Sequence, residues 1–246
     1  MDGFIHVAAA GASEAMLQQA INAHNLANAP TVGFKADLVR AESLYLRGAG
    51  HEARAFRQVT ELGADLGAGA LQQTGRDLDI AVNGAGWIAV QGPDGVEGLT
   101  RRGDLRVDEF GQLVNGAGQA VLGNDGPIAL PPFNTLSIGA DGTISIVPLG
   151  EQPNTMAILD RIKLVDPPPG SIRKREDGLF VANDGLPSLP DGNVRVTSGA
   201  LEASNVNPVD AMVRMIELSR EFEHFMKMVS VGEEIDTSSA SLMRIQ

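Results

Sequence analysis

The sequence of 246 residues contains no cysteine. The chain therefore forms no disulfide bonds, and thiolate metal sites and cysteine nucleophiles are excluded as well. The absence of thiols suits a protein that crosses membranes unfolded, because no cysteines can mispair, although many cytosolic proteins lack cysteine too. Nothing in this absence by itself identifies a function.

Positive charge is also scarce, since the formal net charge is −12. Phosphate binding needs a basic surface, so this balance argues against a nucleic-acid partner. The densest basic cluster comprises Arg101, Arg102 and Arg106, and Asp104 and Asp108 are interleaved with it. We interpret these alternating charges as the solvated face of a strand.

Long apolar runs are missing: none approaches the ~18 residues that a membrane-spanning helix needs. The N-terminus does not resemble a cleaved secretory signal, because Asp2 stands where such signals carry positive charge and the first basic residue is Lys35. If the protein leaves the cytoplasm, we expect a route without a cleaved signal.

Apolar periodicity predicts a helix over residues 3–29. Ile5, Ala8, Ala12 and Ala15 recur at spacings of three and four, and Leu26 continues the same register. Small side chains allow another helix to approach closely but bury little area each, so this helix needs a partner.

The helix is predicted to end within Asn22–Lys35. Pro30 opposes helical continuation, and Gly33 permits a change of backbone direction. We expect Asn25 and Asn28 to hydrogen-bond backbone groups freed at this end. These two asparagines then either form a junction that is used in assembly or simply cap the C-terminal end of the helix.

The middle of the chain changes character twice. Residues 36–73 include glycine-rich stretches without a clear period, so we interpret them as a connector with at most one hairpin-like excursion. Residues 74–200 alternate short apolar runs with Asp-Gly dipeptides, which favour tight turns. This pattern predicts a central antiparallel β domain.

Residues 201–246 return to a helical pattern that starts near Pro208. The expected apolar seam between the two terminal helices consists of Ile5, Ala12, Met215, Leu218, Phe222, Phe225 and Val229. The predicted fold is α+β: residues 1–35 and 201–246 supply the two helices of a split, coiled-coil-like terminal domain, and a central all-β domain lies between them.

No catalytic, cofactor or metal constellation emerges from the sequence. Gly84-Ala85-Gly86 resembles part of a dinucleotide fingerprint, but a strand-like run follows it where a helix would be required. A tight hairpin turn at Asn83-Gly84 explains it better. The four histidines are scattered, without metal-ligand spacing. We expect no enzymatic activity, no cofactor and no small-molecule substrate.

Several blocks together resemble the bacterial flagellar rod and hook proteins. The N-terminal block is Asn25-Leu26-Ala27-Asn28 followed by Gly33-Phe34-Lys35. Further blocks are Thr74–Gly84, Thr100–Gly103, Gly111–Val114 and Leu201–Pro208, the last of which contains Ser204, Asn205 and Val206. The blocks occur in the family's order and cover essentially the whole chain. The segment Asp177–Phe180 and the chain length are most similar to a proximal rod protein.

The resemblance implies a structural subunit of the proximal rod that assembles helically and transmits torque for motility. Its implied partners are copies of itself, other rod proteins and, during secretion, the flagellar type III export apparatus. The implied location is the basal-body rod spanning the periplasm, with the terminal helices in an inner tube and the β domain outside. A distal rod or hook-type subunit is the alternative. A peptidoglycan hydrolase domain is a third, weaker hypothesis.

Overall fold

The computed structural model describes residues 2–45, 55–150, 155–168 and 170–243. The chain divides into two compact units. The helical unit comprises Met1–Asn28, Asp37–Gly63 and Val206–Gln246, and the β unit comprises Ala29–Ala36 and Ala64–Asn205. Each unit therefore contains segments that are far apart in the sequence.

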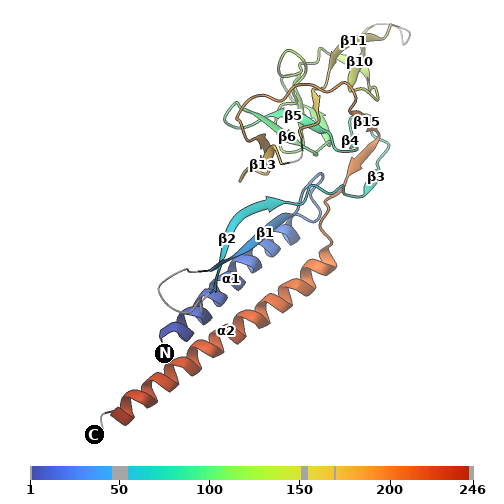
Figure 1. The fold of residues 1–246 in the computed structure, drawn as a ribbon. Coiled ribbons are helices and arrows are strands. Elements are labelled where there is room, and N and C mark those ends of the chain that lie inside the picture. The colour runs from blue at the N-terminus through green and yellow to red at the C-terminus, as the bar shows by residue number, and fades with distance from the viewer. Residues whose placement is uncertain (1, 46–54, 151–154, 169, 244–246) are drawn as a thin grey trace. The chain divides into compact units, whose positions relative to one another are not determined.

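The helical unit contains the two long helices (Figure 1), α1 (Asp2–Ala27) and α2 (Pro208–Met243), which pack against each other. Helix α2 starts at the predicted proline. The Asn207 side chain accepts a hydrogen bond from the Val209 amide at 3.0 Å, and the Asn207 carbonyl accepts one from the Ala211 amide. Asn207 is thus a conventional N-cap.

The same unit contains a small sheet that the predicted fold class did not include. Strands β1 (Asp37–Tyr45) and β2 (Ala55–Ala64) pair with each other, and β1 contacts α1. In Figure 1 this sheet runs alongside α1. Strand β3 (Leu71–Gln73) follows, so residues 36–73 include three strands among the described residues.

The prediction of a coiled-coil-like terminal domain is wrong, although the α+β assignment is consistent with the structure. The helices are not arranged as a coiled coil, and a two-stranded sheet shares their unit. Buried positions on α1 are the small residues Ala8, Ala12 and Ala15, which cannot act as interlocking knobs. Instead, the ring of Phe225 occupies the space over Gly11, where an added Cβ would lie 2.4 Å from the ring.

Antiparallel sheets make up the β unit, as the sequence predicts. One sheet has the strand order β12 (Leu164–Val165), β5 (Trp87–Gln91), β6 (Glu97–Thr100), β14 (Phe180–Ala182) and β13 (Ile172–Lys174). Another has the order β11 (Ala157–Arg161), β10 (Thr143–Pro148) and β9 (Phe133–Ile138). The paired strands are β15 (Arg195–Ser198) with β4 (Ile80–Asn83), β16 (Ala200–Glu202) with β3, and β7 (Leu105–Val107) with β8 (Leu113–Asn115).

Two apolar clusters form the core of the β unit. The larger is aliphatic and centres on residues such as Ile88, Leu105 and Ile144, and the smaller contains Trp87 and Phe180 with ring centroids 4.5 Å apart. Gly84, at φ 76°, makes the turn from β4 to β5. These strands lie in different sheets, so the turn is not the predicted hairpin, but a strand follows it as predicted and the dinucleotide fingerprint is excluded.

Candidate functional site

Asn25 joins the last turns of α1 to the first residue of β1. Its side-chain amide donates to the Asp37 carbonyl at 2.9 Å, and its side-chain oxygen accepts from the Asp37 amide at 2.8 Å. His24 Nδ1 lies 2.7 Å from a carboxylate oxygen of the same Asp37. Asn25 thereby pairs with a backbone as a neighbouring strand would, and it sets where β1 begins.

Asn28 closes the end of α1. Its side chain donates to the His24 carbonyl at 3.1 Å, and its backbone amide approaches the carbonyls of His24 and Asn25. These are the carbonyls that a helix end leaves without intrahelical donors. Between the two asparagines, Leu26 is half-buried and Ala27 is exposed.

Gly33 and Phe34 belong to the β unit. Gly33 has φ 67°, and an added Cβ would lie 2.3 Å from the carbonyl carbon of Arg101, so glycine is required there. Its amide donates to the Glu202 carbonyl at 2.7 Å. The ammonium of Lys174 lies 4.0 Å from the centroid of the Phe34 ring.

Asn205 is the last residue of the β unit in sequence, and its side chain bonds to backbone groups as that of Asn25 does. Its side-chain oxygen accepts from the Ala36 amide at 2.8 Å, and its side-chain amide donates to the Asp65 carbonyl at 2.9 Å. Ser204 and Val206, its neighbours, are half-buried. Asn25 and Asn205 each use one amide to hold backbone that is distant in sequence.

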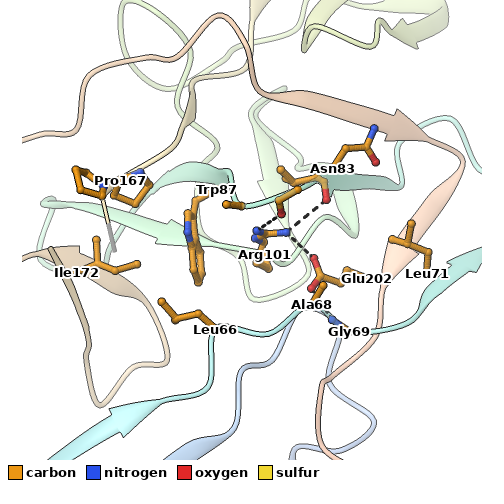
Figure 2. A pocket seen from close by; sticks show the side chains of 14 residues that line it. Leu66, Ala68, Gly69, Leu71, Asn83, Trp87, Arg101, Pro167, Ile172 and Glu202 are labelled. Atoms are coloured by element: carbon orange, nitrogen blue, oxygen red, sulfur yellow. Dashed lines mark hydrogen bonds and ion pairs between the residues drawn. The ribbon is translucent and has the colours of Figure 1, made fainter. Parts of the chain in front are cut away.

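A buried ion cluster lies next to these motifs. The Lys35 ammonium is 2.6 Å from one carboxylate oxygen of Glu202. The Arg101 guanidinium is 3.0 Å from the other oxygen, a pair that Figure 2 shows. All three side chains are at most 3% exposed. The Gly69 amide also donates to Glu202, at 2.9 Å. One carboxylate therefore pairs with two buried cationic groups, and each pairing offsets part of the cost of burying charge.

Burial and pairing act in opposite directions on these groups. Burial lowers the pKa of Lys35 below its ordinary value, and the hydrogen bond to Glu202 offsets this in part. Burial raises the pKa of Glu202, but the hydrogen bonds from Lys35 and Gly69 and the charge of Arg101 outweigh it, so this pKa lies below its ordinary value. Glu202 is therefore ionised at neutral pH.

Sequence reasoning missed this cluster and assigned Arg101 to a solvated strand face, which is wrong because Arg101 is 3% exposed. Arg106 is exposed, as predicted, and Arg102 is paired with Asp104 at 2.8 Å. A signal was present: Lys35, Arg101 and Glu202 come from three of the blocks that carry the family resemblance. Each of these three blocks contains a charged residue that no catalytic or binding motif accounts for. That pattern could have indicated that the three residues meet in one ion cluster.

The predicted seam residues lie on the two helices of the helical unit. Ala12 and Leu218 are buried, and Ile5, Met215, Phe222, Phe225 and Val229 are half-buried. The Asn22 side chain additionally donates to the Ala211 carbonyl at 2.7 Å, which ties α1 to α2. Arg214 of α2 also donates to the side-chain oxygen of Gln18 of α1, at 3.5 Å. The contact between the helices therefore combines a tight ring-on-glycine contact with polar ties.

Much of the apolar surface of these helices remains exposed. The exposed large apolar side chains on α1 are Val7, Met16 and Leu17, and those on α2 are Val209, Met212, Val213, Ile216, Met226, Met228, Val231 and Ile235. We call these residues the open apolar face. On α2, Val209, Met212, Val213 and Ile216 recur at spacings of three and four and therefore share one side of the helix. Exposed apolar surface marks interaction sites in soluble proteins.

Other kinds of site find no support in the part of the chain that the structure describes. There, no group of three or more His, Cys, Asp or Glu side chains is placed to hold a metal ion. Within the same residues, neither helix combines the length and hydropathy needed to cross a membrane.

Comparison with protein families matches two regions of the chain. Residues 197–242 match the model described as flagellar basal body rod FlgEFG protein C-terminal. Residues 81–146 match the model described as flagellar hook protein FlgE/F/G D1 domain. The first covers most of α2, and the second lies within the β unit.

Curated relatives match over nearly the whole length. The flagellar basal-body rod protein FlgF of Salmonella typhimurium is 39% identical, with 99% of both chains covered. FlgF of Escherichia coli is 42% identical, with 94% of both covered. The rod protein FlgG of Bacillus subtilis is 32% identical, with 90% of this chain and 91% of the relative covered.

Proposed function

The chain belongs to the flagellar basal-body rod FlgEFG family, and on this premise we propose how it is built into the rod. It is a structural subunit of the basal-body rod. Its identity to the FlgF proteins of Salmonella typhimurium and Escherichia coli, 39% and 42% over nearly full length, exceeds the 29–32% found with three FlgG proteins, and the FlgF proteins of three other bacteria are 30–33% identical. A FlgF-type, proximal rod position is therefore favoured over a distal rod or hook position.

The observation that carries the proposal is the open apolar face. Two helices that bury only a narrow seam leave large apolar side chains in water. Each Å² of apolar surface left exposed forgoes ~25 cal/mol of burial free energy. Neighbouring subunits that cover this face recover that free energy. Because a face that binds a different face on the next copy does not close, repetition builds a helical filament.

The residues of the family motifs fall into groups with different structural roles. Asn25, Leu26, Ala27 and Asn28 end α1, while Gly33, Phe34, Ser204 and Asn205 adjoin Lys35 and Glu202 of the ion cluster in the sequence of the β unit. Val206 begins the last segment of the helical unit. We assign these residues to assembly indirectly: they fix where the helices end, and the helices supply the surface. The seam residues Ile5, Ala12, Met215, Leu218, Phe222, Phe225 and Val229 keep α1 on α2.

A charge placed on the open apolar face tests the proposal. We expect Ile216→Asp, at a position 56% exposed, to leave the isolated subunit folded but to abolish its incorporation into the rod. The reason is that assembly would bury an unpaired carboxylate. The measurement is swimming in soft agar, with recovery of the chain in purified basal bodies, in a flagellated host that lacks its own FlgF.

The matched control is Thr237→Asp, which places the same charge at an exposed position of α2 whose neighbours three and four residues away do not belong to the open apolar face. It should retain motility. Normal motility with Ile216→Asp, or equal loss with both variants, would contradict the assignment of assembly to this face.

For partners and location, we propose copies of this chain and adjacent rod proteins in the periplasmic rod, reached through the type III export apparatus without cleavage of a signal. The absence of cysteine is consistent with export unfolded. Recovery of intact chain, with its N-terminal residues, from purified basal bodies would test both points.

We also propose that the subunit catalyses no reaction. Its buried ionisable groups Lys35, Arg101 and Glu202 form ion pairs with one another. A lytic zymogram of the purified protein tests the rival hydrolase hypothesis. Clearing of peptidoglycan that one carboxylate substitution abolishes would overturn this proposal.

A further inference from the structure

The β unit contains the pentapeptide Val-Asn-Gly-Ala-Gly twice, at residues 82–86 and 114–118. In each copy the asparagine is the last residue of a strand, since Asn83 ends β4 and Asn115 ends β8. Asparagine is thermolabile, and most so before glycine, because glycine has no Cβ to hinder attack of its amide nitrogen on the asparagine side chain. The two copies have the same local sequence, so any difference in their reactivity comes from the fold.

The fold encloses the second copy. Asn115 is 0% exposed, its Oδ1 accepts from the amides of Ala117 and Gln119 at 3.0 Å each, and its Nδ2 donates to the Gln119 side chain at 2.7 Å. A Cβ added to Gly116 would lie 1.9 Å from a carboxylate oxygen of Asp104. The Asn115 side chain therefore turns toward the Gly116 nitrogen only when these hydrogen bonds break and the turn opens.

The first copy is open to solvent. Asn83 and Gly84 are both exposed, and a Cβ added to Gly84 would meet no atom within 4 Å. The Asn83 Oδ1 accepts from the Thr197 hydroxyl at 3.1 Å, and its Nδ2 has no protein partner among the described residues. Figure 2 shows the Asn83 side chain directed away from Arg101. One exposed hydrogen bond is a weak restraint, because water competes for it.

We propose that Asn83 is a site of spontaneous deamidation in the folded chain and that Asn115 is protected from the same reaction. The Gly84 amide nitrogen loses its proton to solvent and attacks the Asn83 Cγ. The new N–Cγ bond closes a succinimide ring, the Cγ–Nδ2 bond breaks, and the side-chain nitrogen takes up a proton and leaves as ammonia.

Water completes the reaction by adding to one of the two ring carbonyls. Opening of the ring leaves either aspartate or isoaspartate at residue 83. Water is the only co-reactant, and every reacting group of the protein belongs to one β unit. The modification therefore needs no second copy, and its test is independent of whether the chain enters the rod.

The two products differ in their effect on the strands. Asn83 is opposite Arg195 in the pairing of β4 with β15, so aspartate would place a carboxylate across from a cation and keep the backbone unchanged. In isoaspartate the main chain passes through the former side chain, which adds one backbone atom between β4 and β5. Since β5 begins with the buried Trp87, we expect this product to be less stable than the natural chain.

Peptide mapping by mass spectrometry tests the proposal on the folded, full-length chain, kept at physiological temperature and mildly alkaline pH. Trypsin releases residues 77–101, in which Asn83 is the only asparagine, whereas Asn115 lies in the peptide of residues 107–161. Replacement of an amide by an acid changes the mass, which isomerisation of the Asp-Gly dipeptides does not. We expect Asn83 to react at least about tenfold faster than Asn115, which reacts only while its turn is open.

The matched control is the same chain held unfolded in urea, where the two identical pentapeptides should react at similar rates. Equal rates at the two asparagines in the folded chain would overturn the proposal. So would an Asn83 that stays intact in the folded chain while it reacts in urea.

Two variants test the consequence for stability. Asn83→Gln keeps an amide but would have to close a larger ring, so its peptide of residues 77–101 should gain no mass and its unfolding temperature should not fall on storage. Asn83→Asp should unfold close to the temperature of the natural chain. The stored natural chain should lose stability in proportion to its isoaspartate, which chromatography of the peptide separates from aspartate. Equal loss in stored Asn83→Gln would contradict the assignment of this effect to Asn83.

Discussion

Glu202 is the residue on which the two most buried cations of the β unit depend. It binds Lys35 and Arg101 through separate oxygens, and all three side chains are withdrawn from water. A buried pair adds little net stability over apolar packing, but removal of one partner leaves the others uncompensated. The fold therefore requires all three residues together, although the cluster itself adds little net stability.

Glu202→Gln should therefore destabilise the β unit strongly, by about 3–5 kcal/mol, because both cations lose their counter-charge. Urea unfolding followed by Trp87 fluorescence measures the change. Asp94→Asn is the control, since it breaks the exposed pair with Arg175 and should have little effect. Similar midpoints for the two variants would contradict the role of the cluster.

The pH dependence of stability follows from the lowered pKa of Glu202. A carboxyl group whose pKa is lower in the folded state stabilises the fold above its unfolded value, ~4.3, and this contribution is lost as pH falls through the folded value. We expect the melting temperature to decline below about pH 4, measured by circular dichroism. Glu202→Gln should flatten this decline, and Asp141, whose pKa is also lowered, should account for part of what remains.

At the level of elements, α1 and α2 meet through small residues rather than interlocking large ones. Gly11 leaves room for the Phe225 ring, and Asn22 ties α1 to the start of α2. This allows the two helices to approach closely while their larger side chains remain available elsewhere. Tight but narrow packing is suited to helices that must also contact neighbouring subunits.

The effect of Gly11→Ala on stability should have the opposite sign to the effect of the same change in an exposed helix. In an exposed helix interior this change stabilises by ~1 kcal/mol, but here the added methyl group collides with Phe225, so we expect destabilisation instead. In the Phe225→Ala background the same change should stabilise. A double-mutant cycle on helix unfolding measures the coupling, and additive effects would contradict the contact.

At the level of the whole molecule, the two units differ in how they bury their apolar residues. The β unit closes two cores of its own, whereas α2 buries Ala211 and Leu218 and leaves many large apolar side chains exposed. The helical unit is therefore the part whose stability depends on neighbours.

Amide hydrogen exchange of the dilute subunit should show this difference. Amides of α1 and α2 should exchange at least about tenfold faster than those of β5 and β6, because little burial opposes local opening of the helices. In assembled rods the helices should become protected. Strong protection of α1 in the dilute subunit would contradict the dependence on neighbours.

The sequence by itself determined the two terminal helices, the antiparallel central region and the family. These follow from periodicity, from turn-forming dipeptides and from ordered motifs, all of which are encoded locally. Pro208 predicted the start of α2 because its missing amide donor suits a first helical position.

Only the tertiary structure decided how the helices pack and what the motifs hold together. The heptad-like spacing on α2 did not reveal that Gly11 would receive Phe225 or that a two-stranded sheet would share the unit. Charge alternation around Arg101 suggested a solvated strand, whereas the fold pairs it with Glu202, 101 residues later in the chain. Such contacts depend on which distant segments the β unit brings together, and local patterns carry no information about that choice.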